Sequence, residues 1–268
     1  MKKRITIISI ILIIMYLFNL IYISNTHIHI RFEEINTNQK NTNNTSLVFF
    51  SDILIDKSSD YLIETINNIN KLHPDIVLFG GNLFSNNINE YDEETINKIK
   101  KQLNSINAKK GKFATLGNID SINEENKNII KDILFSCEFE ILENETIQIN
   151  NNDFIFNLVG INNAINTDLT QINNDTKIDN DYYTIVMSNT PNTIEYYNNK
   201  YNYFLAGNTL GGEVRIPLLG SLNSYNHKYI YNKFYINDSI LDITNGIGNI
   251  NYDFRLYSNR EIVHYTID

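Results

Sequence analysis

FLAGNTLGGEVRIP, residues Phe204–Pro217, places a glycine-rich turn between two apolar runs. The first run, Phe204–Ala206, ends at Gly207, and the second, Val214–Ile216, follows the pair Gly211-Gly212. Glycine supplies the positive φ that such a turn needs. The pattern predicts a strand, a polar loop that carries Asn208, and a second strand. Because ligands of α/β proteins collect beyond the carboxyl ends of strands, this loop is a candidate site.

The rest of the chain alternates short apolar runs with amphipathic ones in its first half. Helical spacing of apolar residues predicts helices at 62–72, 96–106 and 129–134. The second half holds strands with little helix between them. The predicted strands are 47–50, 76–79, 112–116, 139–142, 145–149, 154–160, 183–187, 203–206, 214–216, 234–236, 240–244 and 261–267. This order predicts an α/β fold with two packed mixed β-sheets flanked by helices.

The N-terminus has the composition of a membrane anchor. Lys2, Lys3 and Arg4 precede the apolar run Ile5–Ile23, which is about the length needed to cross a bilayer. The basic flank predicts a single-pass orientation with the rest of the chain on the extracytoplasmic side. A cleaved signal peptide is the main alternative, and a buried core helix is another. We expect an anchor at 1–24, a polar linker at 25–45 and a folded domain at 46–268.

Composition excludes several classes of protein. The net charge is −9, and no run of Lys or Arg occurs beyond the first four residues, so nucleic acid is not an expected partner. Cys137 is the only cysteine, which excludes a disulfide within the chain and a thiolate metal cluster. With 42% hydrophobic residues, the chain can bury a sizeable core.

Five predicted strands end in a small residue followed by a short polar side chain. In parallel sheets these ends would converge on one crevice. The five blocks are Ser51-Asp52-Ile53-Leu54, Gly80-Gly81-Asn82-Leu83, Gly117-Asn118-Ile119-Asp120, Ser188-Asn189-Thr190-Pro191 and Gly207-Asn208-Thr209-Leu210-Gly211-Gly212.

In order and spacing, these blocks resemble the signature of the calcineurin-like metallophosphoesterases, D-x-H, G-D, G-N-H-D, H-x-P and G-H-x-H-G-G. The tail is similar to that of the membrane-associated bacterial branch of the superfamily. Its pieces here are Val214-Arg215-Ile216-Pro217, Gly246-Ile247-Gly248, Arg255 and Glu261-Ile262. The resemblance covers 47–268 and implies an α/β/β/α sandwich. It also implies metal-dependent phosphoester hydrolysis with two divalent cations, manganese, iron or zinc.

The chain departs from that signature at its metal ligands. Asp52 keeps the first carboxylate and Asn118 survives, but Asn82 stands where the family has its bridging carboxylate. The histidine positions hold Leu54, Ile119, Asn189, Asn208 and Leu210. Two divalent ions facing one carboxylate would repel each other strongly in a partly desolvated cleft. We therefore expect no bound cofactor and no catalytic residue.

Two functions remain open. The first is a pseudoenzyme that binds a cell-envelope ligand or a protein partner in a vestigial cleft. The cleft residues would be Asp52, Asn82, Asn118, Asp120, Asn189 and Asn208. The second is a residual phosphoesterase acting on cell-envelope or phospholipid phosphoesters, with calcium or magnesium held weakly by Asp52, Asn82 and Asn118. A surface protein without a cleft ligand is a third reading. His227 is a candidate contact at the cleft rim, and His27 and His29 are a candidate metal pair beside the membrane.

Overall fold

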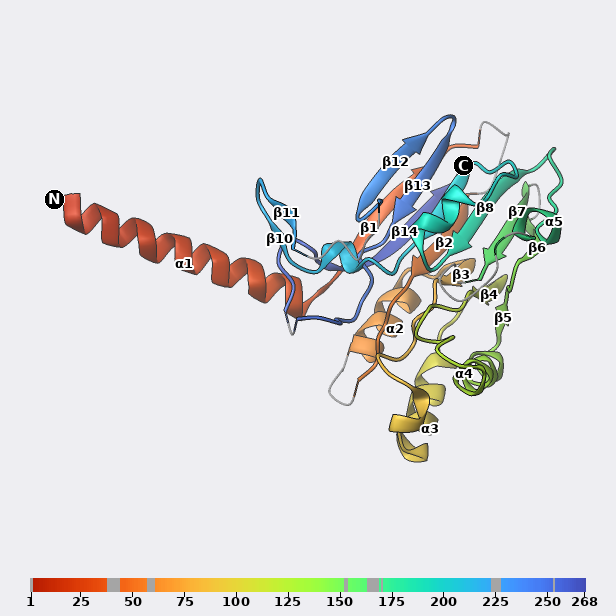
Figure 1. Cartoon of the computed structure of the whole chain (residues 1–268), viewed down its shortest axis with the longest axis horizontal. Coiled ribbons are helices and arrows are strands. Elements are labelled where there is room, and N and C mark those ends of the chain that lie inside the picture. Colours follow the sequence, from red (N-terminus) through yellow and green to blue (C-terminus); the bar gives the residue numbers. More distant parts are fainter. Residues whose placement is uncertain are drawn as a thin grey trace.

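Two six-stranded sheets form the centre of the molecule in the computed structural model (Figure 1). The structure describes residues 2–37, 44–56, 61–151, 154–162, 169, 171–222, 228–252 and 254–268. The helices are α1 (Lys2–Thr26), α2 (Tyr61–Lys71), α3 (Glu93–Leu103), α4 (Glu124–Ser136) and α5 (Ile172–Asp175). Single 3-10 turns lie at Ile88–Glu90, Pro191–Glu195 and Leu210–Gly212.

The first sheet has the strand order β1-β14-β2-β3-β4-β5. β14 is antiparallel to β2, whereas the other neighbours pair in parallel. Its strands are β1 (Ile28–Ile35), β2 (Thr45–Phe50), β3 (Ile76–Phe79), β4 (Gly111–Ala114), β5 (Phe139–Ile141) and β14 (Arg260–Ile267).

The second sheet has the strand order β12-β13-β9-β8-β7-β6, with antiparallel pairs at both ends and parallel pairs between them. Its strands are β6 (Glu145–Asn151), β7 (Phe154–Ile161), β8 (Tyr183–Ser188), β9 (Tyr203–Ala206), β12 (Asn232–Ile236) and β13 (Ser239–Ile243). A separate hairpin pairs β10 (Arg215–Ile216) with β11 (Gly220–Ser221).

The alternation of side chains along each strand builds the layers. In β2, Leu47 and Phe49 face the second sheet, where they pack with residues such as Leu205, and Val48 and Phe50 face the helices. A strand buried on both faces reads as a continuous apolar run, which is why this strand is recognisable in the sequence. The predicted α/β fold with two packed mixed sheets and flanking helices is therefore confirmed.

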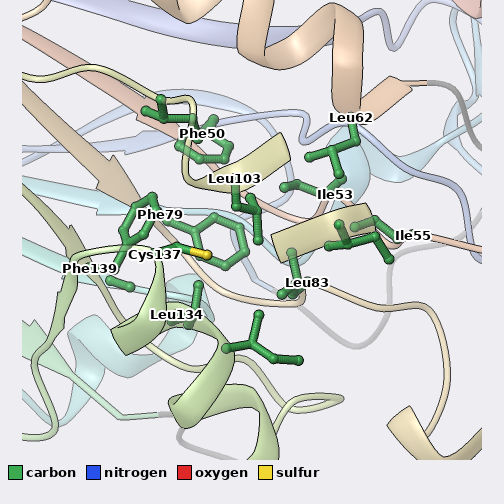
Figure 2. Close-up of a cluster of buried hydrophobic side chains, with 14 of the residues drawn as sticks. Phe50, Ile53, Ile55, Leu62, Phe79, Leu83, Leu103, Leu134, Cys137 and Phe139 are labelled. Atoms are coloured by element: carbon green, nitrogen blue, oxygen red, sulfur yellow. The ribbon is translucent and has the colours of Figure 1, made fainter. Parts of the chain in front are cut away.

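Helices α2, α3 and α4 cover the outer face of the first sheet (Figure 1). Figure 2 shows Phe50, Phe79 and Phe139 beneath these helices, with Cys137 among them. Side-chain caps set two of the helix starts: Asp92 accepts a hydrogen bond from the backbone N–H of Thr95, and Asn123 caps α4 in the same way. α5 and the 3-10 turn at Pro191–Glu195 cover the other sheet.

The expected polar linker at 25–45 holds a strand in its described part. β1 pairs in parallel with β14 along its full length, so the sheet begins before residue 46. Ile28 and Ile35 are buried at the two ends of β1, and polar side chains lie between them. A strand at the edge of a sheet tolerates this composition because one long side is unpaired.

α1 projects away from the two sheets as a single straight helix (Figure 1). Its described apolar side chains are largely solvent-exposed, from Ile5 at 56% to Phe18 at 70%. Among the helices that the structure describes, none is long and apolar enough to cross a membrane. The structure therefore does not support the expected transmembrane helix.

A buried ion pair ties β1 to the second sheet. Asp242 on β13 is inaccessible to solvent and accepts hydrogen bonds from both Nη atoms of Arg31, at 3.1 and 2.8 Å. The hydroxyls of Tyr265 and Tyr203 donate to the same carboxylate, at 2.8 and 3.3 Å. Removing one partner of such a network leaves the remaining groups buried without compensation.

We predict that Asp242→Ala lowers the free energy of unfolding by about 3 kcal/mol, because it leaves two buried tyrosine hydroxyls without their acceptor and leaves Arg31 with only Glu33 and Glu261 as partners. The double variant Arg31→Met/Asp242→Leu should lose less than the sum of the single changes. Lys109→Ala is the control: its ion pair with Asp75 is exposed on the lysine side and should cost less than about 1 kcal/mol. Urea unfolding of the full chain in detergent measures these variants together with the single changes Arg31→Met and Asp242→Leu, and additive losses would contradict the network.

Candidate functional site

The five polar blocks meet where β2, β3 and β4 of the first sheet and β8 and β9 of the second end. Backbone hydrogen bonds join the loops: the N–H of Asp52 donates to Gly81 O at 2.8 Å, and the N–H of Gly207 donates to Asn189 O at 2.9 Å. The parallel direction of these strands places their carboxyl ends together. The two sheets thus share one site at this end of the sandwich.

The side-chain amide of Asn82 lies at the centre of the site. Its Nδ2 is 2.9 Å from Asp52 Oδ1 and 3.0 Å from Asn118 Oδ1. The Oδ1 atoms of Asn189 and Asn208 lie 3.2 and 3.3 Å from the same nitrogen. Four oxygens from four loops therefore converge on one NH₂ group. We call these five residues the Asn82 cluster.

Hydrogen-bond partners orient the amides of the cluster. The backbone N–H of Ile119 donates to Asn82 Oδ1 at 3.0 Å, so the NH₂ end of Asn82 must face the four oxygens. Asn189 donates from Nδ2 to Gly80 O at 2.7 Å, which turns its own oxygen toward Asn82. An NH₂ group carries two hydrogens and faces four acceptors here, so the centre of the cluster is rich in oxygen.

Asp52 is the one carboxylate in the cluster, and it is buried. Its Oδ2 accepts hydrogen bonds from Ser51 Oγ and from the backbone N–H of Asn208, both at 2.7 Å. Burial disfavours the charged form and raises the pKa of Asp52, although these hydrogen bonds act in the opposite direction. The lone negative charge of the cluster is therefore held at a cost to the folded state.

Asp120 lies beneath the cluster and holds the backbone. Its Oδ2 accepts from the N–H groups of Asn82 and Gly117, at 2.6 and 2.9 Å, and its Oδ1 accepts from the N–H of Leu83 at 2.9 Å. Desolvation raises the pKa of Asp120 despite these donors. The residue links two loops and does not touch the converging oxygens.

Two glycines allow the loops to approach one another. A Cβ on Gly117 would lie 2.0 Å from Asn82 Oδ1, and one on Gly207 would lie 2.5 Å from Asp52 Oδ2. Real Cβ atoms do not come so close, so any larger residue would displace the central amide or the carboxylate. The glycines thus set the spacing of the cluster.

The backbone at the site adopts a conformation that leucine rarely takes. Asp52, Leu54, Asn82, Asn208 and Leu210 all have φ between 51° and 66°. Asn and Asp tolerate this left-handed region, whereas a residue such as leucine pays about 1–2 kcal/mol. Such strain persists only where the surroundings impose it, and it gathers at functional sites. The surrounding structure therefore imposes this backbone conformation on Leu54 and Leu210, although it is unfavourable for leucine.

Arg255 supplies positive charge next to the cluster. It is fully buried, and its side chain donates to Asn245 O at 2.8 Å and Asn249 Oδ1 at 3.1 Å. Burial, together with the nearby Arg260, lowers the pKa of Arg255 to about 9, and the charge of Asp52 opposes this shift. Arg255 connects the C-terminal segment to the site electrostatically without a direct ion pair to Asp52.

The structure brings the expected site residues together, with differences in role and exposure. Asp52, Asn82, Asn189 and Asn208 are buried, and Asn118 is half-buried. Ser51 and Thr190 are further members that the sequence analysis did not select. The hydroxyl of Thr190 accepts from Asn208 Nδ2 at 3.2 Å. Both residues lie inside the five sequence blocks, each next to a predicted site residue. That position in the sequence could have identified them as members of the site.

The donor set does not suit a pair of divalent cations. Its centre is an NH₂ group, and amide oxygens are neutral ligands that balance no charge. Within the described ranges, no group of three or more His, Cys, Asp or Glu residues could hold a metal ion. His27 and His29 are exposed beside α1. His227, the candidate contact at the rim, lies outside the described residues.

Comparisons with known proteins found a number of solved structures of similar outline, and two of them are as follows. The NAD nucleotidase of Haemophilus influenzae has a TM-score of 0.47 at 12% identity, over 76% of this chain and 45% of that protein. An archaeal phosphodiesterase has a TM-score of 0.38 at 14% identity, over 77% of this chain and 88% of the other. No protein-family profile and no curated protein matches the sequence. The chain spans less than half the length of the nucleotidase.

We predict that Asp52→Asn flattens the pH dependence of stability. The folded pKa of Asp52 is raised, so its contribution to stability is fully present below the unfolded value of about 3.9 and is lost as pH rises through the folded pKa. An asparagine side chain at this position does not ionise, so this loss of stability with rising pH does not occur in the variant. Urea unfolding at a series of pH values from 4 to 8 measures the slope. The exposed control Asp132→Asn should keep the wild-type slope, and equal slopes for both variants would contradict the assignment.

Proposed function

We propose that this chain is a membrane-anchored, extracytoplasmic pseudoenzyme with a calcineurin-like phosphoesterase fold, which acts by binding. The single observation that carries the proposal is the position of Asn82, whose NH₂ group takes the centre on which four oxygens converge. The five motif blocks support the choice of superfamily. Their loops meet at one end of two packed sheets, as that resemblance implies.

Hydrolysis of a phosphoester by this class of protein needs a metal-activated water and a proton donor for the leaving group. The amide of Asn82 presents N–H hydrogens to the centre, which repel a cation. Ile119, at the position where the resemblance implies an acid, offers only its backbone N–H, and that group is bonded to Asn82 Oδ1. Position 119 therefore supplies no side-chain proton donor, and the NH₂ group at the centre disfavours the cations that would activate a water.

Membrane attachment is proposed for α1. The basic residues Lys2, Lys3 and Arg4 precede the apolar run Ile5–Ile23. α1 stands clear of the domain (Figure 1), and its described apolar side chains are exposed. A helix that is apolar on all sides needs an apolar environment. The proposed partners are a lipid membrane together with a cell-envelope ligand or protein, and the negative charge of the chain disfavours nucleic acid.

A ligand would meet the edge of the cluster. Asn82 and Asn189 are fully buried and bonded to their neighbours, whereas Asn118 and Ile119 are half-buried. We therefore assign the contact with ligand to the side of the site at Asn118. The inner amides hold the loops in place and are not free to bind a sugar or head group.

A weak single-cation site is the alternative, and the convergence of four oxygens favours it. If Asn82 rotated away from Ile119, its own Oδ1 could join Asp52 and Asn118 as ligands for calcium or magnesium, which prefer oxygen. Such a rotation would break the hydrogen bond from the N–H of Ile119. With such a cation bound, the protein would be a residual phosphoesterase that acts on cell-envelope or phospholipid phosphoesters.

We expect the purified full-length protein to contain no stoichiometric manganese, iron or zinc and to release no phenolate from an aryl phosphate in the presence of calcium, magnesium or manganese. Elemental analysis and a colorimetric assay measure both on one preparation. Two equivalents of metal would overturn the pseudoenzyme. Turnover that requires a divalent cation and disappears in Asp52→Ala would establish the alternative.

Asn82→Asp should make the site depend on cations. The new carboxylate would face Asp52 and three amide oxygens, so we expect a loss of about 3 kcal/mol without metal. Calcium or manganese should restore part of this loss, whereas the wild type should show no change. Thermal unfolding with each ion or with a chelator measures the shift. Asn180→Asp, an exposed change of the same kind, is the control. A wild-type Tm that rises with either ion would contradict the prediction.

A further inference from the structure

Exposed apolar side chains gather on the hairpin β10–β11 and on the neighbouring loop 249–257. Leu218 is fully exposed, and Leu219 is exposed by 79%. Leu222, Ile250 and Phe254 have exposed fractions of 56, 46 and 38%. We call these five residues the leucine rim. An exposed apolar cluster that the fold itself does not bury marks a contact with another apolar surface.

Hydrogen bonds hold the hairpin and the loop together. The buried carboxylate of Glu213 accepts from the N–H groups of Ile250 and Asn251, at 2.6 and 3.1 Å through Oε1. The N–H of Leu256 donates to Glu213 O at 3.0 Å, and the N–H of Arg215 donates to Leu256 O at 2.9 Å. The hairpin and the loop therefore form one connected unit, which we call the platform. The leucines of the rim are exposed on this unit in the folded chain.

The platform is attached to the domain end of α1. Asn25 and Arg255 exchange two hydrogen bonds, from Arg255 N to Asn25 Oδ1 at 2.9 Å and from Asn25 Nδ2 to Arg255 O at 3.3 Å. In Figure 1 the hairpin extends from the domain on the same side as α1. The platform thus lies beside the last turns of the helix.

Asn25 sets the level of the platform relative to α1. It lies two residues beyond Ile23, the end of the apolar run, which at 1.5 Å per residue is about 3 Å of helix. If a membrane surrounds that run, the loop that contacts Asn25 lies at the membrane surface, the level at which the apolar face of an interfacial helix enters the bilayer. Tyr252 and Phe254 are in ring contact there, at 5.9 Å, and aromatic residues favour this level of a bilayer.

We propose that the leucine rim inserts into the lipid surface beside α1 and forms a second membrane contact. This inference rests on the proposed attachment of α1. Lipid is the occupant because the rim continues the exposed apolar surface of α1. The loop that carries Asn208 leads into the hairpin through Gly211, Gly212 and Glu213, so the same contact brings the Asn82 cluster toward the membrane.

The absence of tryptophan from the chain allows a direct test. Leu219→Trp places one fluorophore on the rim of the full-length protein. Phe135→Trp, on the exposed face of α4, is the matched control, and Ile10→Trp reports on α1 itself. Each variant is reconstituted into vesicles of equal parts phosphatidylcholine and phosphatidylglycerol. The measurement is quenching by phosphatidylcholine brominated on its acyl chains.

We expect brominated lipid to quench Leu219→Trp at least twofold and to leave Phe135→Trp unchanged. Quenching of Leu219→Trp no greater than that of Phe135→Trp would overturn the rim contact. A blue-shifted Leu219→Trp emission that brominated lipid does not quench would also overturn it, because a protein surface such as a second copy would then cover the rim. Ile10→Trp separates the two proposals: quenching there without quenching at position 219 leaves the anchor and removes the rim.

Discussion

The arrangement of the site depends on one neutral group, the side-chain amide of Asn82. Its NH₂ group faces side-chain oxygens from four loops, and its Oδ1 accepts a hydrogen bond from the backbone N–H of Ile119. A carboxylate has almost the same shape but offers only acceptors. At that position it would turn the four contacts with side-chain oxygens into repulsions unless a cation lay between them, whereas the N–H of Ile119 could still donate to it. The amide therefore joins the loops by hydrogen bonding.

The loops of the site keep a tight backbone geometry around this amide. Leu54 and Leu210 have left-handed conformations, Gly117 approaches Asn82 closely, and both leucine side chains are buried. Asp52 is the lone carboxylate of the cluster, so the cluster carries at most one negative charge. Hydrogen bonds and packing therefore hold these loops together.

The sequence predicts the layers and the membership of the site well, for physical reasons. Strands buried on both faces, such as β2 and β3, are short apolar runs, and side chains at their carboxyl ends must meet. β1 is not among the predicted strands because its partner, β14, comes from the other end of the chain, although its own sequence, IHIRFEEI, alternates apolar and polar residues over 28–33. The inward direction of the amides depends on backbone donors and acceptors such as Ile119 N and Gly80 O, which no residue pattern reveals.

The C-terminal segment links the site to the surroundings of the protein. Arg255 donates to backbone and amide oxygens of residues 245–249, and its own backbone binds Asn25 at the end of α1. Arg260 stacks on Tyr61 and donates to Ile247 O, so a second buried cation braces the same loop. Gly246 in that loop approaches Asp52. These contacts form a continuous path from the end of α1 through Arg255 and the loop 245–248 to Asp52 in the Asn82 cluster.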